Sequence, residues 1–312
     1  MYFILLINFF LLRFSAIHSF NFVAVNLSSL SSYLNYNGNV LPANQPVLMA
    51  ANRAFRYGDA VFETIRLMHG ELLYFEKHLQ RLKKSMHLMG MKWRNDFTFH
   101  NLYLLMRHLD QTNELKGNGR IRLEVFRNDG GRYSPVSNEV SFLIEAEPMS
   151  EKNYQLNENP LRIDVFSDIT KSKNKFSNIK SSNALVFVMA GIYKETSGLD
   201  DCIILNSDGK ICEAIASNIF LISKDEIYTP ALSEGCIDGV LRQQVIETFK
   251  KHNRKTHEVT LTHDHVLKSD EILLTNVIDG IRWVGAFRQK RYFNGSAKWL
   301  LSELNEAQTK KV

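Results

Sequence analysis

Three features between residues 180 and 242 could act together in one chemical site. Lys180 precedes a long apolar segment, Glu213 ends a predicted hairpin strand, and the turn Gly235-Cys-Ile-Asp-Gly-Val-Leu-Arg242 opens a further predicted helix. A lysine amine can form an imine with an aldehyde, and burial lowers its pKa and makes it nucleophilic. A carboxylate can keep a pyridine nitrogen protonated. The unpaired N–H groups at the start of a helix bind phosphate.

Each feature alone has a common structural explanation. Most lysines and most strand glutamates are solvated surface residues, and many glycine-rich helix starts are only turns. Lys180, however, lies beside a predicted core helix, where an unpaired ammonium would be costly. An amine, a carboxylate and an anion cradle in this order predict a protein that holds and uses pyridoxal 5'-phosphate.

Several further motifs accompany these features, and with them the chain resembles the class IV aminotransferase family. This family contains branched-chain aminotransferases, D-amino acid aminotransferases and 4-amino-4-deoxychorismate lyases. The resemblance runs from about Tyr36 to Leu304. The motifs that carry it are Asn52-Arg-Ala-Phe-Arg-Tyr-Gly-Asp-Ala-Val-Phe-Glu-Thr-Ile-Arg66, His78-Leu-Gln-Arg-Leu82, Lys180-Ser-Ser-Asn183, Glu213 with Ser217-Asn-Ile-Phe220, Tyr228-Thr-Pro230 and Gly235–Arg242.

The resemblance implies roles for the residues that would bind pyridoxal phosphate. Lys180 matches the lysine that forms the Schiff base with the cofactor and transfers protons, and Glu213 matches the partner of the pyridine nitrogen. Arg81 matches the arginine that grips the phosphate, a task that suits a guanidinium fork. The family often has threonine at the position of Leu241, so that here only the backbone donor is expected. The remaining cofactor-binding residues are expected to be Val240, Leu241, Thr275 and Asn276.

The substrate side of the site is expected upstream. Tyr57 and Phe62 match pocket residues, and Arg122 and Arg132 lie where different members place an arginine that binds a carboxylate. Arg132 lies in Arg127-Asn-Asp-Gly-Gly-Arg-Tyr133, which looks more like the lyase branch, as does Thr275-Asn-Val-Ile-Asp-Gly-Ile-Arg-Trp-Val284.

Two reactions remain possible at such a site. The leading expectation is amino transfer between an amino acid and a 2-oxo acid. The alternative is 4-amino-4-deoxychorismate lyase activity, which gives 4-aminobenzoate and pyruvate and could use the same lysine. Ser134 replaces the histidine of the D-amino acid enzymes, and Leu185 replaces the tyrosine that branched-chain enzymes usually carry. A third alternative is a binding protein that kept the scaffold without turnover, which the intact lysine, glutamate and arginine argue against.

The elements that must position these residues alternate between helix and strand. Apolar periodicity predicts helices over 72–88, 97–109, 182–193 and 240–250, with strands over 60–68, 120–126, 140–146, 161–166, 201–206, 210–215, 219–222, 226–228 and 271–275. The resemblance implies the two-domain α/β fold of fold type IV enzymes. We expect a small α/β domain over 34–150, a large α/β domain with the lysine over 151–312, and an extension over 1–33.

Composition narrows the class of protein. With 45% hydrophobic and 23% charged residues, the chain is an ordinary globular protein, long enough for two domains. The net charge of +5 is spread over short basic runs, so nucleic-acid binding is not expected. Three cysteines without CxxC spacing argue against a disulfide framework or a zinc site and suggest a reducing, cytoplasmic location. The resemblance implies a homodimer that acts on small amino-acid and 2-oxo-acid substrates, with no metal.

The first residues, MYFILLINFFLLRFSAIHSF, are apolar in a way that allows three explanations. They could be a weak secretion signal, an additional N-terminal element, or the result of a start codon assigned too far upstream. No Lys or Arg precedes the apolar run, and the run is too short to span a bilayer, so no membrane attachment is expected. We favour the upstream start, because a recognisable domain pattern begins only near Tyr36.

Overall fold

The apolar residues of β3 (Ala60–Met68) make it the inner strand of an antiparallel sheet. A computed structural model describes residues 32–309 of the chain. In these residues the first sheet has six strands in the order β2-β1-β6-β5-β3-β4. The other strands are β1 (Tyr33–Tyr36), β2 (Asn39–Pro42), β4 (Glu71–Leu72), β5 (Gly119–Arg127) and β6 (Val140–Pro148).

The second sheet is mixed and holds the C-terminal half of the described chain. Its strand order is β12-β11-β10-β13-β14-β7-β8-β9, with β15 paired to β14 at one side. Parallel pairs join β7 to β8 and to β14, and the remaining pairs, apart from β11 with β12, are antiparallel. The strands are β7 (Leu161–Lys171), β8 (Asp201–Asn206), β9 (Ile211–Ala214), β10 (Asn218–Ser223), β11 (Glu226–Pro230), β12 (Thr256–Val259), β13 (Glu271–Asn276), β14 (Gly280–Phe287) and β15 (Lys290–Arg291).

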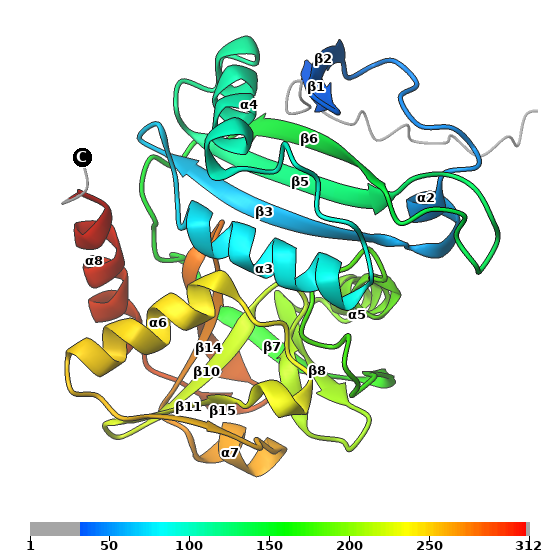
Figure 1. The fold of residues 1–312 in the computed structure, drawn as a ribbon. Helices are drawn as coiled ribbons and strands as arrows, with labels where there is room; N and C mark the ends of the chain where they lie inside the picture. The colour runs from blue at the N-terminus through cyan, green and yellow to red at the C-terminus, as the bar shows by residue number, and fades with distance from the viewer. Residues whose placement is uncertain (1–31, 310–312) are drawn as a thin grey trace, which may run out of the picture. The chain divides into compact units, whose positions relative to one another are not determined.

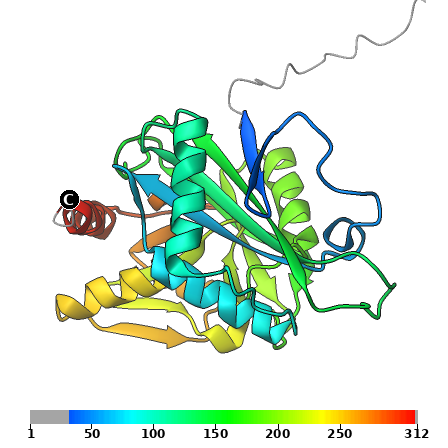
Figure 2. The ribbon, with the colours of Figure 1, turned by 45° about the horizontal axis from the view of Figure 1, so that its top comes forward.

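Helices lie against these sheets, as Figures 1 and 2 show, and their apolar side chains complete the cores. The amphipathic helices α3 (Phe75–Leu88) and α4 (Phe99–Thr112) bury apolar side chains with those of β3, β5 and β6. On the second sheet, α6 (Val240–Lys251) and α8 (Gly295–Thr309) share one core cluster, and α5 (Leu185–Thr196) packs on β7 and β8. Two short helices are α2 (Arg53–Tyr57) and α7 (His263–Lys268), and a 3₁₀ turn spans Leu232–Glu234.

Most predicted elements are present, and three helix starts were predicted too early, by two residues for α4 and by three residues for α3 and α5. The turn at Asn37-Gly38 joins β1 to β2, and Asp208-Gly209 joins β8 to β9, as predicted. Helix α3 begins at Phe75 rather than at residue 72, because Glu71–Leu72 pairs with the end of β3. Helix α5 begins at Leu185 rather than at residue 182, because Ser181 and Ser182 pair with the start of β3.

Other predictions are not tested. The expected extension over 1–33 lies outside residues 32–309 except for its last two residues, and the domain boundary near residue 150 stays a prediction. Between residues 32 and 309 no helix combines the length and apolar character needed to cross a membrane.

Candidate active site

A cavity of about 930 Å³ opens between residues of the first sheet, residues of the second sheet and the loop that leads into α5. Its lining includes every residue that the sequence predicted to bind the cofactor: Arg81, Lys180, Glu213, Val240, Leu241, Thr275 and Asn276. These residues come from α3, the loop before α5, β9, α6 and β13. The fold therefore brings together side chains separated by up to two hundred positions in the chain.

Lys180 is held at the junction of the two sheets. Its carbonyl oxygen accepts the Phe62 N–H at 2.9 Å, and the Ser182 N–H donates to the Ala60 oxygen at 3.0 Å, so the loop pairs with the start of β3. The Lys180 Nζ lies 4.5 Å from the centre of the Phe62 ring. Burial, reinforced by the positive charge of Arg81, lowers the pKa of the Lys180 amine from 10.5 to about 8. The amine is thus far easier to deprotonate than an ordinary lysine.

Arg81 projects from α3 and is clamped by a buried carboxylate. Its Nε and Nη2 donate to Glu63 at 2.9 and 2.5 Å, and its Nη1 donates to the Asp238 carbonyl at 3.0 Å. His78 Nδ1 lies 2.6 Å from the same Glu63 carboxylate. Burial alone would raise the pKa of Glu63, but Arg81 and His78 lower it to about 2. A guanidinium carries five N–H donors, so Arg81 keeps donors for an anion in the cavity.

The start of α6 provides backbone donors beside Arg81. No side chain caps the N-terminus of α6 at Gly239, and the first N–H groups of a helix have no partner within the helix. A Cβ atom at Gly239 would lie 1.9 Å from the Asn218 Oδ1, so any other residue there would have to displace the Asn218 side chain. Val240 and Leu241 line the cavity at this point, while the Leu241 side chain also packs in the core between α6 and α8.

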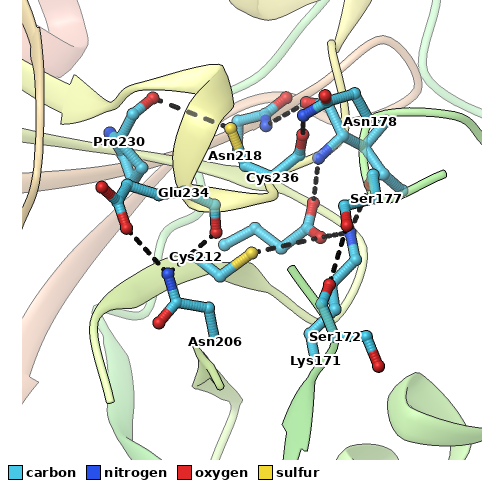
Figure 3. A network of polar contacts seen from close by, with 12 residues as sticks. Lys171, Ser172, Ser177, Asn178, Asn206, Cys212, Asn218, Pro230, Glu234 and Cys236 are labelled. Atoms are coloured by element: carbon cyan, nitrogen blue, oxygen red, sulfur yellow. Dashed lines mark hydrogen bonds and ion pairs between the residues drawn. The ribbon is translucent and has the colours of Figure 1, made fainter. Parts of the chain in front are cut away.

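Asn178 joins this turn to the loop that carries Lys180. Its side-chain amide donates to the carbonyl oxygens of Leu232 and Cys236 at 2.8 and 2.7 Å, and its main-chain carbonyl oxygen accepts the Asp238 N–H at 3.1 Å. The contacts of the Asn178 side chain with the turn are visible in Figure 3. Since Asn178 lies two residues before Lys180, the same contacts fix both the amine and the helix start.

Thr275 and Asn276 end β13 at the rim of the α6 turn. Thr275 is 1% exposed, and its hydroxyl has no hydrogen-bond partner among the described residues. A buried hydroxyl without a partner is costly, and a ligand oxygen in the cavity would satisfy it. Asn276 donates to Ser217 Oγ at 3.1 Å and to Asp279 Oδ2 at 2.8 Å, so it orders the turn after β13.

Glu213 lies on β9, 3% exposed, with both carboxylate oxygens engaged. Oε2 accepts the Ile237 N–H at 3.1 Å, and Oε1 forms an ion pair with the Lys171 ammonium. The two partners come from different parts of the chain, because Lys171 ends β7 and Ile237 lies in the turn before α6. The carboxylate is therefore fixed in the wall of the cavity, where a protonated ring nitrogen could bind it.

Of the residues expected to bind substrate, Phe62 and Arg122 line the same cavity. The Arg122 guanidinium lies 3.8 Å from the centre of the Phe62 ring. Its Nε and Nη2 donate to Glu124 at 3.0 and 2.6 Å, and Glu124 also accepts a hydrogen bond from Ser182 at 2.5 Å. Arg122 is thus held in one orientation before any substrate binds.

Tyr57 and Arg132 lie elsewhere. Tyr57 lines a smaller cavity of about 250 Å³, which shares Met89 and Asn183 with the large one. Arg132 is exposed and lines neither cavity, and its carbonyl oxygen accepts a hydrogen bond from Arg53 at 2.6 Å. The structure of one chain does not bring these two side chains to Lys180.

Sequence reasoning missed Glu63, His78 and Lys171. The first two could have been noticed, because a glutamate on the buried face of a strand and a histidine one turn before Arg81 both need partners. Lys171 offered no such signal, since it stands among other lysines in Lys171-Ser-Lys-Asn-Lys175.

The residues in the cavity fit pyridoxal 5'-phosphate. Free donors at the α6 start, spare Arg81 donors and the unpaired Thr275 hydroxyl suit a phosphate, and Glu213 suits a pyridine nitrogen. The Lys180 amine, with its lowered pKa, suits an aldehyde. Fold and site together define an enzyme of the pyridoxal-phosphate type.

Comparison with known proteins gives the family. The model of amino-transferase class IV matches residues 60–287, so the chain belongs to the class IV aminotransferase family. It is 24% identical to the D-alanine aminotransferase of Bacillus licheniformis over 77% of this chain and 83% of the relative. It is 26% identical to the aminodeoxychorismate lyase of Bacillus subtilis (strain 168) over 78% of this chain and 82% of the relative.

Solved structures agree on the fold. The branched-chain amino acid aminotransferase of Thermobaculum terrenum in its PLP form aligns with a TM-score of 0.78 at 18% identity, over 89% of this chain and 94% of that chain. The mixed α/β structure with two sheets is that of fold type IV, as expected from the sequence. The chain is an enzyme of a family that contains both pyridoxal-phosphate-dependent aminotransferases and lyases, and its cofactor is pyridoxal phosphate.

Proposed function

We propose that the protein is an aminotransferase that moves an amino group between an amino acid and a 2-oxo acid, with Lys180 as its catalytic amine. The observation that carries the proposal is the lowered pKa of Lys180 in a cavity that also contains an anion cradle and a fixed carboxylate. The D-alanine aminotransferase relative and the branched-chain structural neighbours support amino transfer.

Binding would be divided among the residues of the cavity. Pyridoxal phosphate, when bound, supplies an aldehyde that condenses with amines and a ring that takes up electrons from a deprotonated carbon. Arg81, the N–H groups of Val240 and Leu241, and the Thr275 hydroxyl would hold the phosphate, with Asn276 ordering the adjoining turn. Glu213 would bind the ring nitrogen.

Proton transfer would fall to Lys180. Once displaced by the substrate amine, its neutral Nζ would remove the proton from the substrate α carbon as a general base and would then deliver it, as a general acid, to the aldehyde-derived carbon of the cofactor. A pKa of about 8 suits both roles, because the two protonation states are then close in free energy at physiological pH. Arg122, oriented by Glu124 and stacked on Phe62, would bind a substrate carboxylate.

The second candidate is 4-amino-4-deoxychorismate lyase activity. It is favoured by the segment Thr275–Val284, which resembles the lyase branch, and by the Bacillus subtilis relative. Elimination of pyruvate needs the same proton transfers at Lys180, so the catalytic groups serve either reaction. The choice would lie in the substrate side of the cavity.

One experiment separates the two reactions. The purified protein would be assayed with L- and D-amino acids and 2-oxoglutarate or pyruvate, and in parallel for 4-aminobenzoate formation from 4-amino-4-deoxychorismate. We expect amino transfer, and 4-aminobenzoate as the main product would instead assign the lyase. Lys180→Ala should abolish turnover and the visible absorbance of bound cofactor, while Lys175→Ala, at an exposed lysine, should retain both. A fully active Lys180→Ala enzyme would exclude the proposed role.

We further propose that the protein is a cytoplasmic homodimer. The three cysteines are buried free thiols, in keeping with a reducing compartment. On α5 the side chains of Leu185, Val188 and Ile192 are 70%, 54% and 51% exposed and follow helical spacing, which is the pattern of an interface helix. Light scattering of the purified protein should give twice the mass of one chain, and a monomer would contradict the proposal.

A further inference from the structure

We propose that Lys171 is a positioning residue that keeps the Glu213 carboxylate ionised and fixed in the cavity wall. This role rests on the proposed function, in which Glu213 binds the pyridine nitrogen. Lys171 ends β7, and its ammonium forms an ion pair with Glu213 Oε1. The same ammonium donates to the Ser177 carbonyl oxygen at 2.9 Å and lies 5.4 Å from the centre of the Phe187 ring.

The position of Lys171 suits this role. Its side chain is only 11% exposed, and it lines the same cavity as Glu213 and Lys180. A bulge in the pairing of β7 with β8 separates Phe166 from Lys171, so the last residue of β7 pairs with Asn206 instead of continuing the regular register. In contrast, Lys173 and Lys175, on the following loop, are exposed. Of these three neighbouring lysines, Lys171 alone lines the cavity.

A nearby cation has a definite consequence for Glu213. A buried carboxylate without a cation tends to take up a proton, and an adjacent ammonium opposes this. The Lys171 ammonium contacts the Glu213 carboxylate directly, whereas a ring nitrogen bound to that carboxylate would lie farther from it. The ammonium therefore lowers the basicity of the carboxylate more than that of the ring nitrogen. A proton shared between Glu213 and the ring nitrogen would therefore stay on the nitrogen. The Ile237 N–H on the other oxygen fixes the orientation.

The first test uses the full-length protein freed of cofactor. Lys171→Met leaves the Glu213 carboxylate buried without its cation, which favours the protonated carboxyl group in the folded state of this variant. The folded state then holds a proton that the unfolded state has lost, and stability falls as pH rises. We expect the melting temperature of Lys171→Met to fall below that of the wild type by about 5 °C or more at pH 8 and by clearly less at pH 5.5.

Two further variants make the result specific. Lys175→Met, the same change at an exposed lysine four positions away, should leave the melting temperature unchanged at both pH values. Lys171→Met combined with Glu213→Gln removes both charges and should lose the extra pH dependence. The proposal would be overturned if Lys171→Met lowered the melting temperature equally at both pH values and if adding Glu213→Gln did not change this loss. Lys171 would then only have a packing role through Ser177.

The second test uses the loaded protein. The ¹⁵N resonance of ring-labelled pyridoxal phosphate bound to the wild type should be that of a protonated nitrogen, and in Lys171→Met it should move toward the unprotonated value. Lys171→Arg, which keeps the charge, should stay close to the wild type. An identical resonance in Lys171→Met would overturn the role toward the ring nitrogen. If the wild type failed to bind the cofactor, the proposed function would be wrong. The measurement on the cofactor-free protein would still test the ion pair of Lys171 with Glu213, because it does not depend on cofactor binding.

Discussion

Replacing Lys180 by methionine should make the cofactor-free protein more stable near neutral pH. The pKa of the Lys180 amine is lowered from 10.5 to about 8, with burial as the main cause and the positive charge of Arg81 as the next. Each pH unit by which a pKa is displaced corresponds to about 1.4 kcal/mol, so the ionised amine costs the folded state roughly 3 kcal/mol. Methionine has a similar length and no charge, and it removes this cost.

The difference in stability between Lys180→Met and the wild type should depend on pH. The folded-state pKa lies below the unfolded value, so between about pH 8 and pH 10.5 the unfolded chain binds a proton that the folded wild type has released. Wild-type stability relative to the variant therefore rises with pH across this range. The advantage of Lys180→Met should be full below pH 8 and should vanish near pH 10.5.

Denaturant unfolding of the full-length, cofactor-free proteins measures the effect directly. We expect Lys180→Met to unfold with up to about 3 kcal/mol more free energy than the wild type at pH 7. Lys175→Met, at an exposed lysine, serves as the matched control and should change stability by less than about 0.5 kcal/mol. A Lys180→Met protein that is less stable than the wild type, or an advantage that persists unchanged to pH 10.5, would refute the argument that Lys180 is a destabilised ammonium.

Two further predictions concern the phosphate side of the cavity. Glu63→Gln leaves the buried Arg81 without its carboxylate, so it should lower the free energy of unfolding by about 3–5 kcal/mol and weaken pyridoxal phosphate binding. In the wild type the stabilisation by Glu63 is present above pH 4.5 and is lost as pH falls toward 2. Equal acid sensitivity of the wild type and the variant would therefore contradict the prediction. Thr275→Val removes a buried hydroxyl that has no partner within residues 32–309, so the cofactor-free protein should keep its stability while its affinity for pyridoxal phosphate falls about tenfold. The control Thr229→Val, which breaks a 2.8 Å hydrogen bond to the Ile219 carbonyl oxygen, should lower the stability and leave the affinity unchanged. A loss of stability in Thr275→Val would count against a hydroxyl that faces the ligand.

The sequence predicted elements well where the local pattern decides the structure. The strand over Ala60–Met68 was predicted with its observed limits, and both hairpins were located by Asn-Gly and Asp-Gly pairs. The early starts predicted for α3 and α5 have a common cause. In both cases the residues before the helix pair with β3, and periodicity along the chain does not reveal such tertiary pairing. The strand β14 (Gly280–Phe287) and helix α8 were not predicted.

The residues of the candidate site were also predicted only in part. Lys180, Glu213 and the α6 start could be proposed from residue type and order, and the structure places them around one cavity. Lys171 could not be predicted, because its significance depends on a contact with a residue 42 positions away. Tyr57 and Arg132 were expected beside the substrate, but neither lines the cavity of Lys180. Tyr57 ends α2, and Arg132 lies on the loop between β5 and β6, whose carbonyl oxygens at Gly130 and Arg132 accept hydrogen bonds from Arg53. Their roles remain predictions.

The pairing of charges in the cavity helps to explain why the pKa of the Lys180 amine is lowered. The other cations in the lining each have a carboxylate partner, in the pairs Arg81–Glu63, Arg122–Glu124, Arg120–Glu147 and Lys171–Glu213. None of the ion pairs found within residues 32–309 includes Lys180.

The carboxylates near Lys180 are therefore already paired with other cations. Glu63 and Glu213 raise the pKa of Lys180, but each is bound to another cation, and burial with Arg81 outweighs them. Removing Glu63 would therefore lower the pKa of Lys180 further, because Arg81 would act on it without its counter-charge. The ion pairs in the cavity wall thus do more than hold side chains in place: because they occupy the acidic groups, the Lys180 amine loses its proton more readily than an ordinary lysine.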